Sequence, residues 1–137
     1  CGTLFPYTTL YRSLLDTAAG SGAALQRIES EYLGLDHAEV GGLLMEQWHF
    51  PPSLILPCRH HHEESDCPPS LLKDRAVVEA ANAAAHKAGL GQSGNPAPGE
   101  PCRSLERLGL TSTNLDELSR EILAKRERME GFLEAAV

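Results

Sequence analysis

The chain has 137 residues, of which 42% are hydrophobic and 23% are charged, and its net charge is −7. This composition fits a globular domain that is long enough to bury a core. The negative charge and the lack of a long Lys/Arg cluster exclude nucleic acid as the main partner. No apolar run approaches the roughly 20 residues of a membrane span, and the N-terminus lacks the basic region and apolar run from which a signal peptide would be expected. We therefore expect a cytoplasmic protein without a membrane partner.

Helical periodicity extends through nearly every segment, and no segment shows the alternation of a strand. Pro6 suits a first turn, Gly34 a helix stop and Asp36 an N-cap. In chain order, the predicted helices cover about residues 6–18, 23–33, 37–48, 53–61, 71–88 and 115–133, with a helical turn at 104–108.

The third predicted helix places its apolar residues on one face. These residues are His37, Val40, Gly41, Leu44 and Trp48, and we expect the core to cover them. On this spacing His37 is a hydrogen-bonded core histidine. Gly41 would permit another helix to approach closely.

Residues 91–101 are rich in Gly and Pro and form a predicted mobile loop. The Ala-rich helix before the loop is expected at the centre, where a Leu at Ala80 or Ala83 would overpack the core. The sequence thus predicts one all-α domain over residues 1–137, a bundle of about five main helices plus a short one.

The N-terminus reads like the interior of an apolar segment, which predicts a fragment of a longer protein whose upstream half is absent. Such a fragment would expose helix surfaces and associate with itself. The expected contact residues are Leu4, Phe5, Tyr7 and Leu10.

Three of the six histidines form the run His60-His61-His62. Neutral imidazole is a common metal ligand, and His37 supplies a possible fourth ring from elsewhere in the fold. The alternative for the run is a solvated helix end that interacts with the helix dipole. Cys58 and Cys67 flank the run and could complete a structural zinc site, but they lack paired C-x2-C spacing, so free cysteines are the simpler interpretation.

The order of several motifs resembles the HDOD domain, a relative of the HD phosphohydrolases and the HD-GYP phosphodiesterases. The resemblance covers about residues 1–118 and rests on Leu35-Asp36-His37-Ala38-Glu39-Val40-Gly41-Gly42-Leu43-Leu44, Gln47-Trp48-His49-Phe50-Pro51, Arg59-His60-His61-His62, Val77-Val78-Glu79-Ala80-Ala81-Asn82 and Leu105-Glu106-Arg107-Leu108-Gly109-Leu110. It implies an HD-like helical fold.

The resemblance also implies which residues correspond to the metal ligands of the enzymes. His37, His61 and His62 match ligand positions, so they are the candidate metal residues. Asn82 stands where the enzymes carry a ligating Asp, and a neutral amide binds a divalent cation poorly. The Gly-Tyr-Pro motif is absent, and the His-Asp pair of the enzymes would precede Cys1.

The implied function is a non-catalytic regulatory module of a bacterial signalling protein. We expect protein partners or other domains of a longer chain, self-association, and no cofactor beyond a single divalent transition metal. The alternative is a metal-dependent phosphohydrolase that acts on cyclic dinucleotides or other phosphoesters through His37, His61 and His62. A third reading is the structural zinc domain with Cys58 and Cys67.

Overall fold

The computed structural model describes residues 6–64, 66–90 and 94–135, and these residues form helices without strands. The predicted all-α class is therefore confirmed. The elements are α1 (Pro6–Ser21), α2 (Leu25–Leu33), α3 (His37–Gln47), α4 (Pro52–Arg59), the 3₁₀ turn η1 (Pro69–Leu71), α5 (Leu72–Lys87), α6 (Cys102–Leu108) and α7 (Ser112–Ala135). The predicted turn at 104–108 is a full short helix, α6.

Local signals explain where the helices begin and end. Asp36 caps α3, because its side chain accepts hydrogen bonds from the Ala38 and Glu39 amides while the Glu39 side chain accepts one from the Asp36 amide. Gly34 ends α2 in the left-handed conformation, with φ of 75°. The sequence signals for both boundaries were therefore correct.

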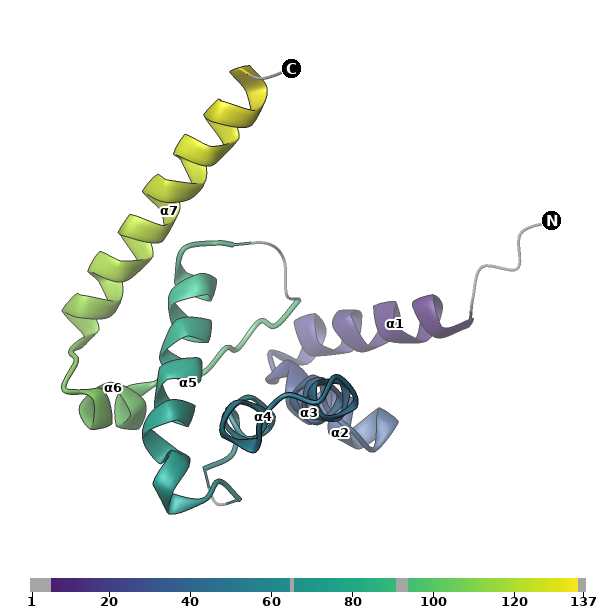
Figure 1. Ribbon diagram of the computed structural model, residues 1–137. Coiled ribbons are helices and arrows are strands. Elements are labelled where there is room, and N and C mark those ends of the chain that lie inside the picture. The colour runs from purple at the N-terminus through teal and green to yellow at the C-terminus, as the bar shows by residue number, and fades with distance from the viewer. Residues whose placement is uncertain (1–5, 65, 91–93, 136–137) are drawn as a thin grey trace.

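The helices contact one another in a series, with α3 and α4 between an N-terminal pair and a C-terminal trio (Figure 1). The pair, α1 and α2, buries a cluster of Leu14, Ala18, Leu25 and Ile28. The trio, α5 to α7, buries a cluster of Ala80, Ala84, Leu105 and Leu115. Because α5 contacts α4, η1, α6 and α7, it occupies the central position that its alanines predicted.

The loop between α5 and α6 is held to the N-terminal pair. The side-chain oxygen of Asn95 accepts hydrogen bonds from the Leu25 amide (3.0 Å) and the Ala97 amide (3.2 Å). Residues 91–93 of the predicted mobile loop lie outside the described residues, and the mobility of the loop stays a prediction.

The predicted buried face of α3 is wrong. Val40, Leu44 and Trp48 are exposed by 50%, 41% and 61%, while Ala38 and Gly42 are buried. His37 is hydrogen-bonded, as predicted, but it is exposed rather than part of the core. A Cβ on Gly42 would lie 2.4 Å from Nε of Arg59, whereas a Cβ on Gly41 would meet no atom within 4 Å. Because α4 approaches at Gly42, α3 packs through its small residues and leaves its large apolar residues outside.

The predicted self-association residues are only partly described. Leu4 and Phe5 lie outside the described residues, as does the side chain of Tyr7. Leu10 is exposed, as expected.

Within the described part of the chain, no helix combines the length and the apolar character needed to cross a membrane.

Candidate metal centre

Three imidazole rings meet where α3 begins and α4 ends. One ring nitrogen from each of His37, His61 and His62 lies within 4.8 Å of the other two. The Nε2 atoms of His37 and His62 are 2.8 Å apart, and the rings of His61 and His62 lie 3.9 Å apart between centroids. The structure thus brings together all three sequence-predicted site residues, while the ring of His60 does not belong to this group.

Glu29 on α2 holds the ring of His37 through Nδ1, the ring nitrogen that does not face His62. Glu29 is only 2% exposed, and its Oε2 atom accepts hydrogen bonds from Nδ1 (2.5 Å) and the backbone amide (3.0 Å) of His37. The Tyr11 hydroxyl on α1 donates to Oε1 of the same carboxylate (3.1 Å). Because Nδ1 of His37 donates a hydrogen bond to this carboxylate, Nε2 of the neutral ring carries the lone pair, and it points toward the cluster.

The other two rings follow α4 directly. Nδ1 of His61 lies 2.6 Å from the carbonyl oxygen of Cys58, which can only accept, so the Nε2 lone pair of a neutral His61 is available. This pattern, in which a second ring nitrogen donates to a carboxylate or a carbonyl, is the usual support of a metal-binding histidine.

The environment favours neutral rings in the two later histidines. Burial lowers the pKa of His62 to about 4, and the neighbouring His61 and His37 act in the same direction. Burial also lowers the pKa of His61, against an opposing hydrogen bond from its ring to Cys58. Neutral imidazole is the form that binds metals.

The separation of two of the three donors is close to that of two ligands on one transition metal. Two nitrogens that each lie about 2.0–2.1 Å from a metal are separated by ~2.9 Å at a right angle and ~3.3 Å at a tetrahedral angle. The 2.8 Å between the Nε2 atoms of His37 and His62 is close to that range. Imidazole donors suit zinc, nickel or iron better than magnesium or calcium, which prefer oxygen.

Among the described residues, no acidic or cysteine side chain joins the three rings. Cys58 contributes its carbonyl rather than its thiol, and burial raises the pKa of the Cys67 thiol. The zinc site with Cys58 and Cys67 therefore finds no support in this geometry. Asn82 is half-buried on α5 and brings no charge to compensate a cation.

Sequence reasoning missed the residues that support the rings. Glu29 lies four positions after Leu25 and one after Ile28, on the buried side of α2. An acidic residue in such a place needs a buried partner, and this is the signal that could have identified it. For Tyr11 the sequence offers no comparable signal.

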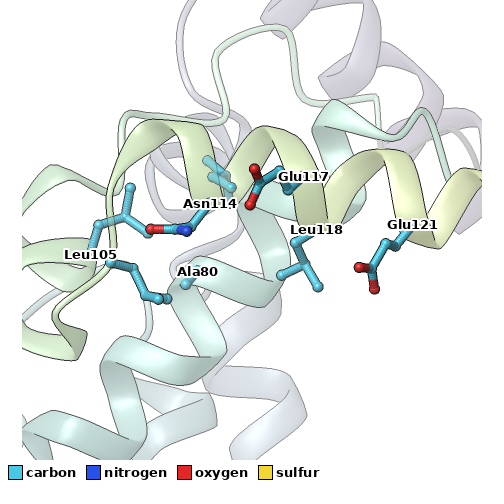
Figure 2. Close-up of a pocket in the computed structure, with 8 residues that line it drawn as sticks. Ala80, Leu105, Asn114, Glu117, Leu118 and Glu121 are labelled. Carbon is cyan, nitrogen blue, oxygen red and sulfur yellow. The ribbon is translucent and has the colours of Figure 1, made fainter.

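A separate groove lies between α5, α6 and the start of α7, away from the histidines. It encloses about 330 Å³ and is mainly apolar, with carboxylates at its edge (Figure 2). Its lining comprises Ala80, Leu105, Leu110, Asn114, Leu115, Glu117, Leu118 and Glu121. None of the three histidines contributes to this groove.

Comparison with known families agrees with the motif resemblance over the first half of the chain. The HDOD domain model matches residues 3–64, a range that contains His37, His61 and His62. The match ends before α5, so the correspondence drawn for Asn82 rests on the resemblance alone. No curated protein and no solved structure is significantly similar to the chain. Residues 3–64 thus match the HDOD domain model, and the three-histidine cluster lies within this matched segment.

Proposed function

We propose that this protein is a regulatory module of HDOD type in which His37, His61 and His62 hold one transition metal without catalysing hydrolysis. The observation that carries the proposal is the composition of the cluster: three imidazole nitrogens within 4.8 Å and no carboxylate among them. A two-metal hydrolytic site needs bridging or anionic ligands to balance its charge. Three neutral rings offer none, so they suit one weakly held ion.

The proposal includes a setting that the family resemblance suggests. We place the module in the cytoplasm of a bacterium, as part of a signalling protein whose other domains or protein partners it contacts. The metal-free alternative for the cluster is a hydrogen bond between the Nε2 atoms of His37 and His62, which are close enough for one ring to donate to the other.

The first experiment measures metal binding. Chelator-treated protein is titrated with Zn²⁺ by calorimetry and with Co²⁺ by its visible absorption. We expect one equivalent to bind, and His37→Ala, His61→Ala and His62→Ala to abolish binding. His60→Ala is the matched control, because it belongs to the same run but not to the cluster. Equal binding by all five proteins, or none by the wild type, would contradict the metal assignment.

A metal-dependent phosphohydrolase is the second candidate. It is favoured by the accessibility of His37, whose side chain is 42% exposed, since a metal held by three histidines there would keep a fourth position open for water. Metal-loaded protein is assayed with bis(p-nitrophenyl) phosphate and cyclic dinucleotides. We expect no turnover. Hydrolysis that disappears in His37→Ala and persists in His60→Ala would establish the enzyme instead.

A further inference from the structure

Arg75 on α5 is a buried cation, with only 4% of its surface exposed. A guanidinium stays charged at any ordinary pH, and a buried charge requires compensating partners. Arg75 has four: the carbonyl oxygens of His60 and His61 and the carboxylates of Glu79 and Glu64.

Two of these partners belong to the backbone of the histidine run. Nε of Arg75 donates to the carbonyl of His60 (2.8 Å), and Nη2 donates to the carbonyl of His61 (3.3 Å). These carbonyls belong to the peptide groups on either side of His61, so they fix the directions from which the rings of His61 and His62 project. A planar guanidinium with several fixed donors can hold two such groups at once.

The carboxylate partners extend the same network to α6. Oε1 of Glu64 accepts from Nη2 of Arg107 (2.7 Å), while its Oε2 lies 3.5 Å from Nη1 of Arg75. Glu79 contacts Nη1 of Arg75 (3.0 Å) and accepts from the hydroxyl of Ser104 (2.5 Å). A continuous set of charge-assisted contacts therefore joins the peptide groups of the histidine run to two side chains of α6.

We propose that Arg75 is the positioning residue of the three-histidine cluster and that it links the cluster energetically to α6. The positioning of the rings in the metal-free protein is inferred from these contacts alone. The effect on metal affinity rests on the proposed function. A purely structural buried ion pair would instead affect stability and leave the rings of the folded protein unchanged.

The first test records the ¹⁵N resonances of the histidine rings without metal. We expect Arg75→Met to shift or broaden the signals of His61 and His62 while those of His49 and His86 stay in place. Arg75→Lys should restore part of the wild-type spectrum because it keeps the charge. Lys87→Met is the matched control, since it removes an ion pair of α5 with Asp116 of α7. Unchanged His61 and His62 signals in folded Arg75→Met would overturn the positioning role.

The link to α6 is tested with Arg107→Met, which removes the hydrogen bond of Arg107 to Glu64. We expect it to perturb the His61 and His62 ring signals in the same direction as Arg75→Met but less. If Arg75→Met does not fold, Arg75→Lys and Arg107→Met carry the test. If the His61 and His62 ring signals of folded Arg107→Met match those of the wild type, the link between the cluster and α6 is overturned.

Metal affinity supplies the second readout. Arg75→Met should weaken Co²⁺ binding by roughly 10- to 100-fold, the range for lost outer-sphere support, and Arg107→Met by roughly 2- to 30-fold. A changed Co²⁺ absorption spectrum in Arg75→Met would show that ring geometry is altered. Equal affinities in the wild type and both variants would overturn the link. If the wild type binds no metal, the proposed function is overturned, and the positioning role is then decided by the ring spectra.

Discussion

Glu29 combines burial with a charge, and its two oxygens receive the Tyr11 hydroxyl and two donors of His37. Glu29→Gln removes the charge and turns an amide group toward one of these donors. We expect the free energy of unfolding to fall by about 1–3 kcal/mol, and Zn²⁺ affinity to fall by roughly 10- to 100-fold. Urea denaturation and calorimetry measure the two effects.

Tyr11→Phe provides the graded comparison for this prediction. It removes one hydrogen bond to Glu29 and leaves both contacts with His37, so its cost should not exceed about 1.5 kcal/mol. Burial and the adjacent Glu29 both raise the pKa of Tyr11, so the hydroxyl keeps its proton and remains a donor at neutral pH. If Glu29→Gln were as stable as the wild type, the carboxylate would not be the anchor of His37.

At this scale the sequence predicted the members of the histidine cluster better than the residues that support them. His37, His61 and His62 were identifiable because a motif order resembles a family. The role of Glu29 depends on the angle at which α2 meets the start of α3, and that of Arg75 on the approach of α5 to the histidine run. Neither angle follows from helical periodicity, which defines faces within one helix only.

Among the elements, α3 carries two adjacent glycines that should respond to alanine with opposite signs. A Cβ on Gly42 would lie 2.4 Å from Nε and 3.0 Å from Cβ of Arg59, so Gly42→Ala should cost about 1–3 kcal/mol. Gly41 has open space and lies inside the helix, so Gly41→Ala should stabilise the protein by about 0.5–1 kcal/mol. Thermal unfolding of both variants decides this. A loss of stability in Gly41→Ala would instead support the sequence-based prediction that another helix approaches closely at Gly41.

The alanines of α5 allow a similar comparison. Ala84 is fully buried in the cluster with Leu105 and Leu115, so Ala84→Leu should cost about 1–3 kcal/mol through overpacking. Ala80 belongs to the same cluster but also lines the groove of Figure 2, whose volume can receive a larger side chain. In place of the overpacking expected from the sequence, the cost of Ala80→Leu should therefore stay below about 1 kcal/mol. Denaturant midpoints test this order. Equal losses in the two variants would mean that the groove is not available to the new side chain.

Helix boundaries were predictable because their signals are local: a capping box at Asp36, a left-handed Gly34 and prolines at helix starts. The packing face of α3 was not. Its apolar residues predicted burial, but whether another surface covers Val40, Leu44 and Trp48 depends on tertiary contacts. α4 takes the side of the small residues, because only there can two helices approach so closely.

Across the whole molecule, the histidine cluster lies at the junction between two separately packed parts. His37 is held by α1 and α2 through Tyr11 and Glu29, and the later histidines are held by α5 through Arg75. A metal bound to all three rings would join the start of α3, which contacts the N-terminal pair, to the segment after α4, which contacts the C-terminal trio. Binding should therefore raise the thermal midpoint of the whole chain, as expected for a ligand that binds only the native state.

The outer face of α3, formed by Val40, Leu43, Leu44 and Trp48, leads to a prediction for the whole molecule. All four side chains are exposed, and their spacing of three and four residues places them along one side of the helix. Exposed apolar patches of this kind promote association. We expect the sedimentation coefficient to rise with protein concentration, and more steeply at high salt, which screens the repulsion between chains of net charge −7.

A matched pair of variants locates this association on α3. Leu44→Gln and Leu123→Gln remove leucines of similar exposure, one on the outer face of α3 and the other on α7. Because both positions are on the surface, each change should alter folding stability by less than about 0.5 kcal/mol. Leu44→Gln should shift the protein toward monomer, whereas Leu123→Gln should sediment like the wild type. A wild type that stays monomeric over the whole concentration range, or an equal response of the two variants, would show that the outer face of α3 does not bind a second copy.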